Sequence, residues 1–214
     1  MKWMTAAAAG MVLAASATAT RAADDFAVEL SLGYSRLEMD GKNSKALDGA
    51  DGAASRITFM APAPHAPGFR FGFGLTGSAY RDEFHVTDSD GDTEHRYREL
   101  DLFIPELRVA YFIPIHDFFI EPNFGLGLAV GDYRQGEVHH HHHDDFNDDE
   151  FDDNHDDIYR VNVSLRPGIK IGYGRGPWAA GVEASYLWTH LHFDEGVGGD
   201  IGEAYVGGFF RWTF

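Results

Sequence analysis

Residues 209–214, Phe-Phe-Arg-Trp-Thr-Phe, decide how the rest of this chain is interpreted. In a β-strand successive side chains point to opposite faces, so Phe210, Trp212 and Phe214 lie on the same face. On a water-exposed edge strand such a face would promote aggregation. Against lipid, the same rings lie where hydrocarbon meets the head groups. The stretch therefore predicts a strand whose aromatic face is turned toward a membrane.

The amino terminus has the pattern of an export signal. Lys2 supplies a positive charge, an alanine-rich apolar stretch covers residues 5–19, and small residues at 20 and 22 permit cleavage after Ala22. The apolar stretch is shorter than the roughly 20 residues of a membrane-spanning helix, and no later segment is long enough. We therefore expect residues 1–22 to be a cleaved signal peptide and residues 23–214 to form a single domain.

Eight segments alternate apolar and polar residues, which indicates eight β-strands. In the first segment Leu30 and Leu32 lie on one face, and Glu29 and Ser31 lie on the other. The other seven segments lie near residues 55–61, 69–76, 103–111, 120–130, 160–171, 178–188 and 203–214. With the apolar face against lipid, the pattern predicts an all-β fold, an eight-stranded antiparallel up-and-down transmembrane β-barrel.

The connections between these segments alternate in length. Those around residues 62–67, 113–117 and 174–177 are short and contain Pro, Gly or Asp, whereas those around residues 40–54, 85–96, 131–157 and 191–201 are long. Short periplasmic turns and long extracellular loops are typical of outer-membrane barrels. We therefore expect a bacterial outer-membrane location, with both termini in the periplasm and residues 131–157 as an extracellular loop.

Charged residues recur on the polar face of the predicted strands. An eight-stranded barrel is only wide enough to be filled by side chains. Because an unpaired buried ion costs several kcal/mol, charges inside it must pair. Five acids and seven bases come close to balance, which predicts a plugged interior without an open pore. This interior charge network consists of Glu29, Arg56, Arg70, Glu106, Arg108, Glu121, Arg160, Arg166, Lys170, Glu183, Glu203 and Arg211.

Together, the export signal, the eight alternating segments and the terminal FFRWTF resemble the eight-stranded outer-membrane β-barrel superfamily. The resemblance is to the OmpA membrane domain and OmpX-like barrels, and it covers the whole mature chain. It implies contact with outer-membrane lipid and lipopolysaccharide. It also implies that the strand ending at Phe214 is recognised by the barrel-assembly machinery.

The overall charge excludes one class of partner. The chain contains 34 Asp and Glu against 17 Lys and Arg, a formal net charge of −17, so nucleic acid would be repelled. It contains no cysteine, which rules out disulfide bonds and thiolate ligands within this chain.

The loop at 131–157 is the segment most suggestive of a ligand. Ten acids and six histidines lie between Glu137 and Asp157, without a Lys or Arg. Imidazole suits Zn²⁺, Ni²⁺ or Cu²⁺, although no cofactor is required by the fold. The alternatives are a solvated, self-repelling acidic loop or an engineered histidine insertion. The candidate metal ligands are His139, His140, His141, His142, His143, Asp144, Asp145 and His155.

A second candidate metal-binding pattern is incomplete. Asp88, Asp90, Asp92 and Glu99 have the spacing of an EF-hand loop, but Thr93 stands where that loop needs glycine. The segment is also flanked by predicted strands rather than helices, so an ordinary acidic loop explains these residues equally well.

A catalytic reading rests on the resemblance alone. Some barrels of this superfamily modify lipid A through a His-X-Ser arrangement beside a carboxylate. His190 and His192 share a lipid-facing register here, and Asp194 and Glu195 follow, but no serine stands at the matching spacing. We therefore predict no catalytic residues. We expect a non-enzymatic surface protein, with metal binding and lipid A modification as the alternatives.

Overall fold

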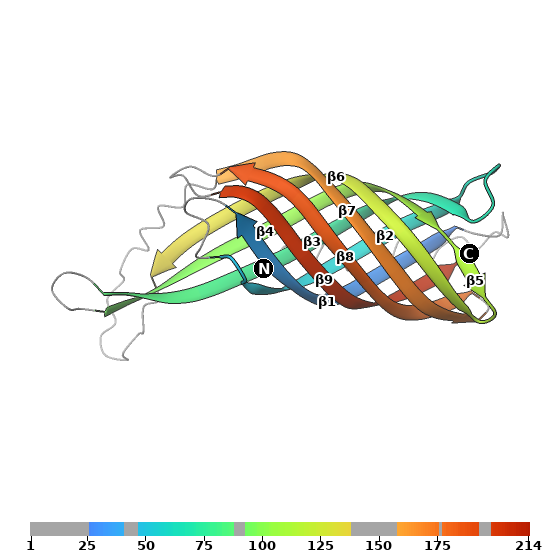
Figure 1. Ribbon diagram of the computed structural model, residues 1–214, viewed down its shortest axis with the longest axis horizontal. Coiled ribbons are helices and arrows are strands. Elements are labelled where there is room, and N and C mark those ends of the chain that lie inside the picture. Colours follow the sequence, from blue (N-terminus) through green and yellow to red (C-terminus); the bar gives the residue numbers. More distant parts are fainter. Residues whose placement is uncertain (1–25, 41–46, 88–92, 138–157, 176, 193–197) are drawn as a thin grey trace, which may run out of the picture.

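The computed structural model describes residues 26–40, 47–87, 93–137, 158–175, 177–192 and 198–214. These residues form nine strands (Figure 1). The strands are β1 (Ala27–Asp40), β2 (Asp51–Pro62), β3 (Phe69–Thr87), β4 (Thr93–Tyr111), β5 (Ile113–Ile115), β6 (Phe118–Glu137), β7 (Ile158–Arg175), β8 (Trp178–His192) and β9 (Gly198–Thr213). No helix in the described part of the chain is long and apolar enough to cross a membrane.

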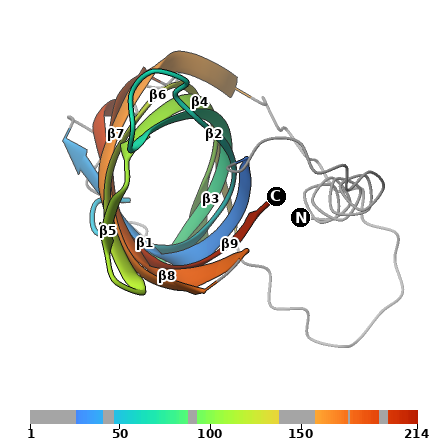
Figure 2. The ribbon, with the colours of Figure 1, turned by 90° about the vertical axis from the view of Figure 1, so that its right-hand side faces the viewer.

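The sheet closes on itself (Figure 2). All pairings are antiparallel: consecutive strands pair except β4 and β5, β4 pairs directly with β6, and β1 pairs with β9. The three-residue β5 pairs only with the start of β6 and does not take part in the closure, so the wall has eight strands. This confirms the predicted eight-stranded antiparallel barrel.

The two ends of the barrel differ. At one end, here called the turn end, short connections at residues 63–68, 112–117 and 176–177 join the strands. Phe214 lies at this end (Figure 1), since Thr213 pairs with Ala27 at the start of β1. The other four connections lie at the opposite end, here called the loop end.

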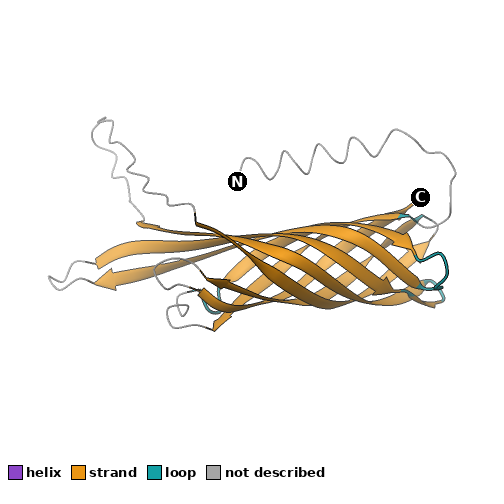
Figure 3. Cartoon of the chain, turned by 90° about the horizontal axis from the view of Figure 1, so that it is seen from above, coloured by secondary structure: helices purple, strands orange, loops and turns teal. Residues whose placement is uncertain are grey.

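The strands continue further toward the loop end than the sequence pattern indicated. The predicted loop at 131–157 begins later, because β6 runs to Glu137 and pairs with β4 as far as Arg96. Similarly, most of the predicted loop at 85–96 is strand, since β3 and β4 pair out to Thr87 and Thr93. The alternation of apolar residues ends with the membrane, whereas backbone pairing does not depend on it. The result is a β3–β4–β6 extension that projects beyond the other strands (Figures 1 and 3).

The outer wall is apolar, as predicted. Leu32 on β1, Leu107 on β4 and Val206 on β9 are each about 60% exposed or more. Every barrel strand except β2 presents exposed large apolar residues outward, and on β2 Ile57 and Phe59 are partly exposed. At the turn end, aromatic rings contact one another around the wall: Trp178 and Trp212 stack 4.7 Å apart, and Trp212 and Phe214 stack 4.8 Å apart. This arrangement is the aromatic girdle expected at a membrane interface.

Toward the loop end, the interior is apolar, a feature that the alternating sequence pattern does not predict. Inward-facing side chains from six strands and from the turn after β1 form one buried cluster, here called the apolar cap. Tyr133 packs against it. The cap consists of Leu37, Met39, Leu47, Ala50, Tyr80, Leu100, Leu102, Ile104, Ala129, Leu187, Leu191 and Ile201.

Candidate functional site

The charges predicted for the interior lie there in two groups. Ten of the twelve are at most 3% exposed, while Arg70 and Arg160 are half-buried. The ten are five glutamates and five bases, so the buried set has no net formal charge. This balance matters because a buried ion without a partner would cost several kcal/mol.

The first group, the turn-side cluster, consists of Glu29, Glu121, Lys170 and Arg211. Arg211 donates from Nε and Nη2 to Glu29 at 3.0 and 2.8 Å, and from Nη2 to Glu121 at 2.5 Å. Lys170 donates to Glu29 and lies 3.9 Å from Glu121. Two acids and two bases from β1, β6, β7 and β9 thus neutralise one another across the lumen.

An aromatic floor lies against the turn-side cluster. The buried rings of Phe119 and Phe209 lie 6.0 Å apart, and the partly buried ring of Phe112 lies 4.9 Å from Phe119. The Arg211 guanidinium lies 5.1 Å from the centre of the Phe119 ring and 5.7 Å from that of Phe209. These cation–π contacts place aromatic side chains between the cluster and the turn end.

The second group, the central cluster, lies between the turn-side cluster and the apolar cap. It consists of three arginines and three glutamates, again without net charge. Arg56 and Arg108 both donate a hydrogen bond to Glu183, Arg108 at 3.3 Å. Ser31 and Ser78 donate to Glu183 and Glu203 at 3.1 Å each. The members are Arg56, Glu106, Arg108, Arg166, Glu183 and Glu203.

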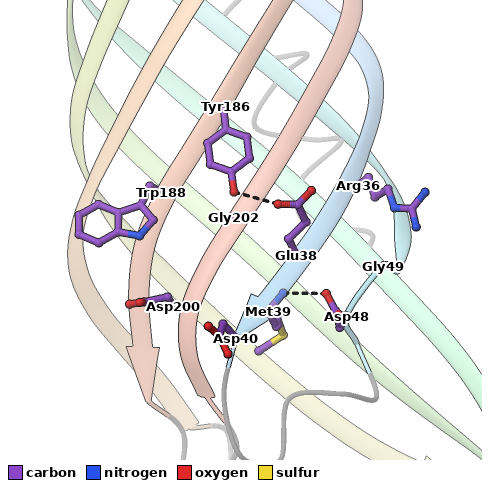
Figure 4. A pocket seen from close by; sticks show the side chains of 10 residues that line it. All are labelled: Arg36, Glu38, Met39, Asp40, Asp48, Gly49, Tyr186, Trp188, Asp200 and Gly202. Carbon is purple, nitrogen blue, oxygen red and sulfur yellow. Dashed lines mark hydrogen bonds between the residues drawn. The ribbon is translucent and has the colours of Figure 1, made fainter.

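A groove of about 790 Å³ lies on the outer wall at the loop end (Figure 4). It is formed by β1, β8, β9 and the turn at residues 47–49. The Tyr186 hydroxyl donates to Glu38 at 3.0 Å across β9, in the space left by Gly202. A Cβ on Gly202 would lie only 2.0 Å from that hydroxyl. The groove thus combines aromatic side chains with carboxylates at the upper border of the apolar wall.

The groove residues were not among the sequence candidates, although β1 carried a signal for them. Beyond Tyr34, the outward positions of β1 change from apolar residues to Arg36, Glu38 and Asp40. This change marks the level at which the wall leaves hydrocarbon. Among the described residues, no group of three or more His, Asp or Glu side chains is placed to hold a metal ion, the groove carboxylates included.

The comparisons with known proteins show similarity at the level of fold. No protein-family model and no curated protein sequence matches the chain. Among solved structures, it is similar to Neisserial surface protein A, with a TM-score of 0.50 and 12% identity over 88% of this chain and 97% of that chain. It is also similar to the outer membrane protease OmpT from Escherichia coli, with a TM-score of 0.50 and 10% identity over 92% of this chain and 99% of that chain.

The chain has the fold of an eight-stranded outer-membrane β-barrel. The N-terminal β-barrel domain of OprF from Pseudomonas aeruginosa is also similar, with a TM-score of 0.43 and 14% identity over 89% of this chain and 100% of that domain. At such identities, activity does not transfer between barrels.

The predicted metal ligands lie outside the described residues. This applies to all eight of them, from His139 to His155, and to Asp88, Asp90 and Asp92 of the EF-hand-like pattern. Glu99 is described, on β4, where it accepts a hydrogen bond of 3.1 Å from Arg81. Metal binding by the loop therefore stays a prediction.

Of the residues in the catalytic alternative, the side chain of His190 lies in the described part of the barrel. His190 lies on the outer wall of β8, with Nδ1 2.9 Å from Oδ1 of Asp200, a partner that the sequence pattern did not indicate. The side chain of His192, together with Asp194 and Glu195, lies outside the described residues. A histidine oriented by a carboxylate can act as a general base. In the described part of the chain, however, no serine hydroxyl is hydrogen-bonded to His190.

Proposed function

We propose that this protein is a non-enzymatic outer-membrane barrel with both termini in the periplasm and a structural or surface-interaction role at its loop end. The observation that carries the proposal is the filled interior. The aromatic floor, the two neutral ion clusters and the apolar cap follow one another along the lumen. A barrel built in this way is a rigid platform rather than a diffusion pore.

The loop end supports the interaction role. The β3–β4–β6 extension carries paired charges and rings in water, with Arg81 3.1 Å from Glu83 and Arg98 above the ring of Phe84 at 4.2 Å. Strands that continue well past the apolar wall hold these side chains in a defined arrangement. A fixed arrangement of side chains outside the membrane is useful for contact with lipopolysaccharide or another surface, and it is not needed for spanning the bilayer.

The pore question is tested by reconstitution of the full mature barrel in planar lipid bilayers. We expect no conductance steps, measured beside a general porin in the same membranes. Regular single-channel openings would overturn the platform proposal, because they require a continuous aqueous path through the lumen.

The interaction role is tested on whole cells. A variant in which residues 84–96 at the tip of the extension are replaced by a short turn is expected to lose binding to lipopolysaccharide-coated or matrix-coated surfaces. A matched variant with residues 63–68 replaced at the opposite end is expected to bind as the unmodified protein does. Equal binding by all three proteins, at equal surface levels, would contradict the role of the loop end.

Divalent-metal capture is a second candidate, favoured by the five consecutive histidines at residues 139–143 among acids. Zn²⁺ titration by calorimetry is the test, with residues 139–155 replaced by a Gly/Ser linker in the control variant. Stoichiometric binding that disappears in the variant would establish a metal site. Heat no larger than that from a free histidine-rich peptide would leave an acidic, solvated loop.

A further inference from the structure

The two ion clusters differ in how their charged groups meet. In the turn-side cluster, Arg211 is hydrogen-bonded to both of its glutamates at 2.5–3.0 Å. In the central cluster, Glu106 lies 3.4–3.5 Å from three arginines, and Arg166 lies 3.6 Å from Glu203, without hydrogen-bond geometry. Charge-assisted hydrogen bonds normally measure about 2.7–2.9 Å. Glu106 and Arg166 are therefore close enough to their partners to be neutralised but not hydrogen-bonded. Glu183 in the same cluster, in contrast, accepts hydrogen bonds from Arg56 and Arg108.

Several buried polar atoms of the central cluster lack a hydrogen-bond partner among the described residues. Arg166 is fully buried, and none of its three guanidinium nitrogens has a hydrogen-bond partner among the described residues. The same is true of both Glu106 carboxylate oxygens and of Glu203 Oε2. Leaving such an atom unpaired costs about 1–3 kcal/mol, and more when the group is charged.

Three hydroxyls nearby are in the same condition. Ser35, Tyr80 and Tyr205 are buried; the Tyr80 hydroxyl lies close to Ser35 and Ser78, but none of the three oxygens makes a hydrogen bond of normal geometry within the described chain. The strand register places them in one row: Ser35 pairs with Tyr205 of β9 on one side and with Gly52 of β2 on the other, and Gly52 pairs with Tyr80 of β3. All three face inward, and Tyr80 lies near Ser78, which donates to the Glu203 carboxylate.

We propose that the central cluster binds a group of ordered water molecules between Arg166, Glu203 and the hydroxyls of Ser35, Tyr80 and Tyr205. A buried water makes about three hydrogen bonds to polar groups that otherwise lack partners. Both donors and acceptors are present here, as a neutral ligand that does both requires. An anion fits less well, because the three arginines are already balanced by three glutamates.

This water is separated from bulk solvent on both sides. The apolar cap lies toward the loop end, with Leu37, Leu100 and Leu187 fully buried, and the rings of Phe119 and Phe209 lie toward the turn end. The interior thus holds a wet layer between two dry ones. The wet layer completes the ion network without creating a channel.

X-ray hydroxyl-radical footprinting of the refolded barrel tests this directly, since the radicals form in place from bound water. Tyr80 and Tyr205 are each 2% exposed, so in a dry interior they would be as protected as Phe119 and Phe209, which are 3% and 4% exposed. We expect labelling of both tyrosines, normalised to the unfolded protein, to be several-fold higher than that of both phenylalanines. Equal protection of all four rings would overturn the proposal.

A crystal structure with bromide in the buffer distinguishes the occupant. Discrete water density within hydrogen-bond distance of Arg166, without anomalous signal, is the expected result. An anomalous bromide peak at Arg166 would overturn the proposal in favour of an anion site. Direct Arg166–Glu106 and Arg166–Glu203 hydrogen bonds with no water between the groups would also overturn it.

Discussion

Gly33 and Gly207 face each other across β1 and β9, where the two backbones approach closely. A Cβ on Gly33 would lie 2.4 Å from the Gly207 Cα and 2.8 Å from the Tyr205 ring. We expect Gly33→Ala to lower the free energy of unfolding by roughly 1–3 kcal/mol, because the backbone itself would have to move. Gly208→Ala is the matched control, since its nearest neighbour lies 3.8 Å away. Urea unfolding followed by tryptophan fluorescence measures both, and equal midpoints would contradict the prediction.

In the turn-side cluster, Arg211 is the base that donates hydrogen bonds to both glutamates, Glu29 and Glu121. Replacing it with Met leaves one unbalanced carboxylate in the lumen, and breaking a buried ion pair in this way costs about 3–5 kcal/mol. The same replacement at Arg81, which is half-exposed and pairs with Glu83 and Glu99 in water, is expected to cost less than about 1 kcal/mol. Urea midpoints of the two variants would show whether burial makes the difference.

At the scale of the strand, the outer face of β6 is suited to hydrocarbon. Leu126 is 47% exposed midway along the apolar wall. We expect Leu126→Lys to destabilise the folded barrel by about 2–4 kcal/mol in lipid bilayers, since a charge at the midplane cannot be hydrated. His65→Lys, on the exposed turn after β2, is the control and should leave stability unchanged. A similar stability for both variants would mean that β6 does not face lipid.

The last strand carries the proposed contact with the barrel-assembly machinery. Phe214 stacks on Trp212 and lies 6.1 Å from Phe26, so its ring also belongs to the turn-end girdle. We expect Phe214→Ala to reduce the amount of heat-modifiable, folded barrel in outer-membrane fractions several-fold. Refolding of the purified variant into detergent should remain efficient, which separates recognition by the machinery from folding. Normal levels in the membrane would remove Phe214 as the signal.

At the scale of the whole molecule, the interior ties all eight wall strands together. Arg56 of β2, for example, donates to Thr76 of β3 at 3.0 Å and contacts Glu106 of β4 and Glu183 of β8. We therefore expect the two ends of the barrel to unfold together. Trp178 at the turn end and Trp188 at the loop end, each kept as the single tryptophan of a variant, should report the same urea midpoint. Separate midpoints would reveal independent halves.

The sequence by itself determined which way each side chain of the wall points. A β-strand has a period of two, so the alternation around Leu30 and Leu32, or around Phe210 and Trp212, assigns residues to lipid or lumen before any pairing is known. The closed antiparallel barrel, its short and long connections and the inward placement of charged residues follow from that rule. Where the alternation of apolar residues stops, the rule stops as well, and this is why the β3–β4–β6 extension was expected to be loop.

Only the tertiary structure decided which inward residues meet. Lys170 and Glu29 are 141 positions apart and pair because the stagger of the closed sheet brings β7 opposite β1 across the lumen. Alternation shows which face of a strand a residue is on, but not its level along the barrel axis. It therefore could not separate the turn-side cluster from the central cluster. Leu102 and Leu187 face inward like the charges, and closure of the barrel is what gathers them into an apolar cap. The period of the chain is local, whereas contacts across a barrel depend on how all its strands are registered.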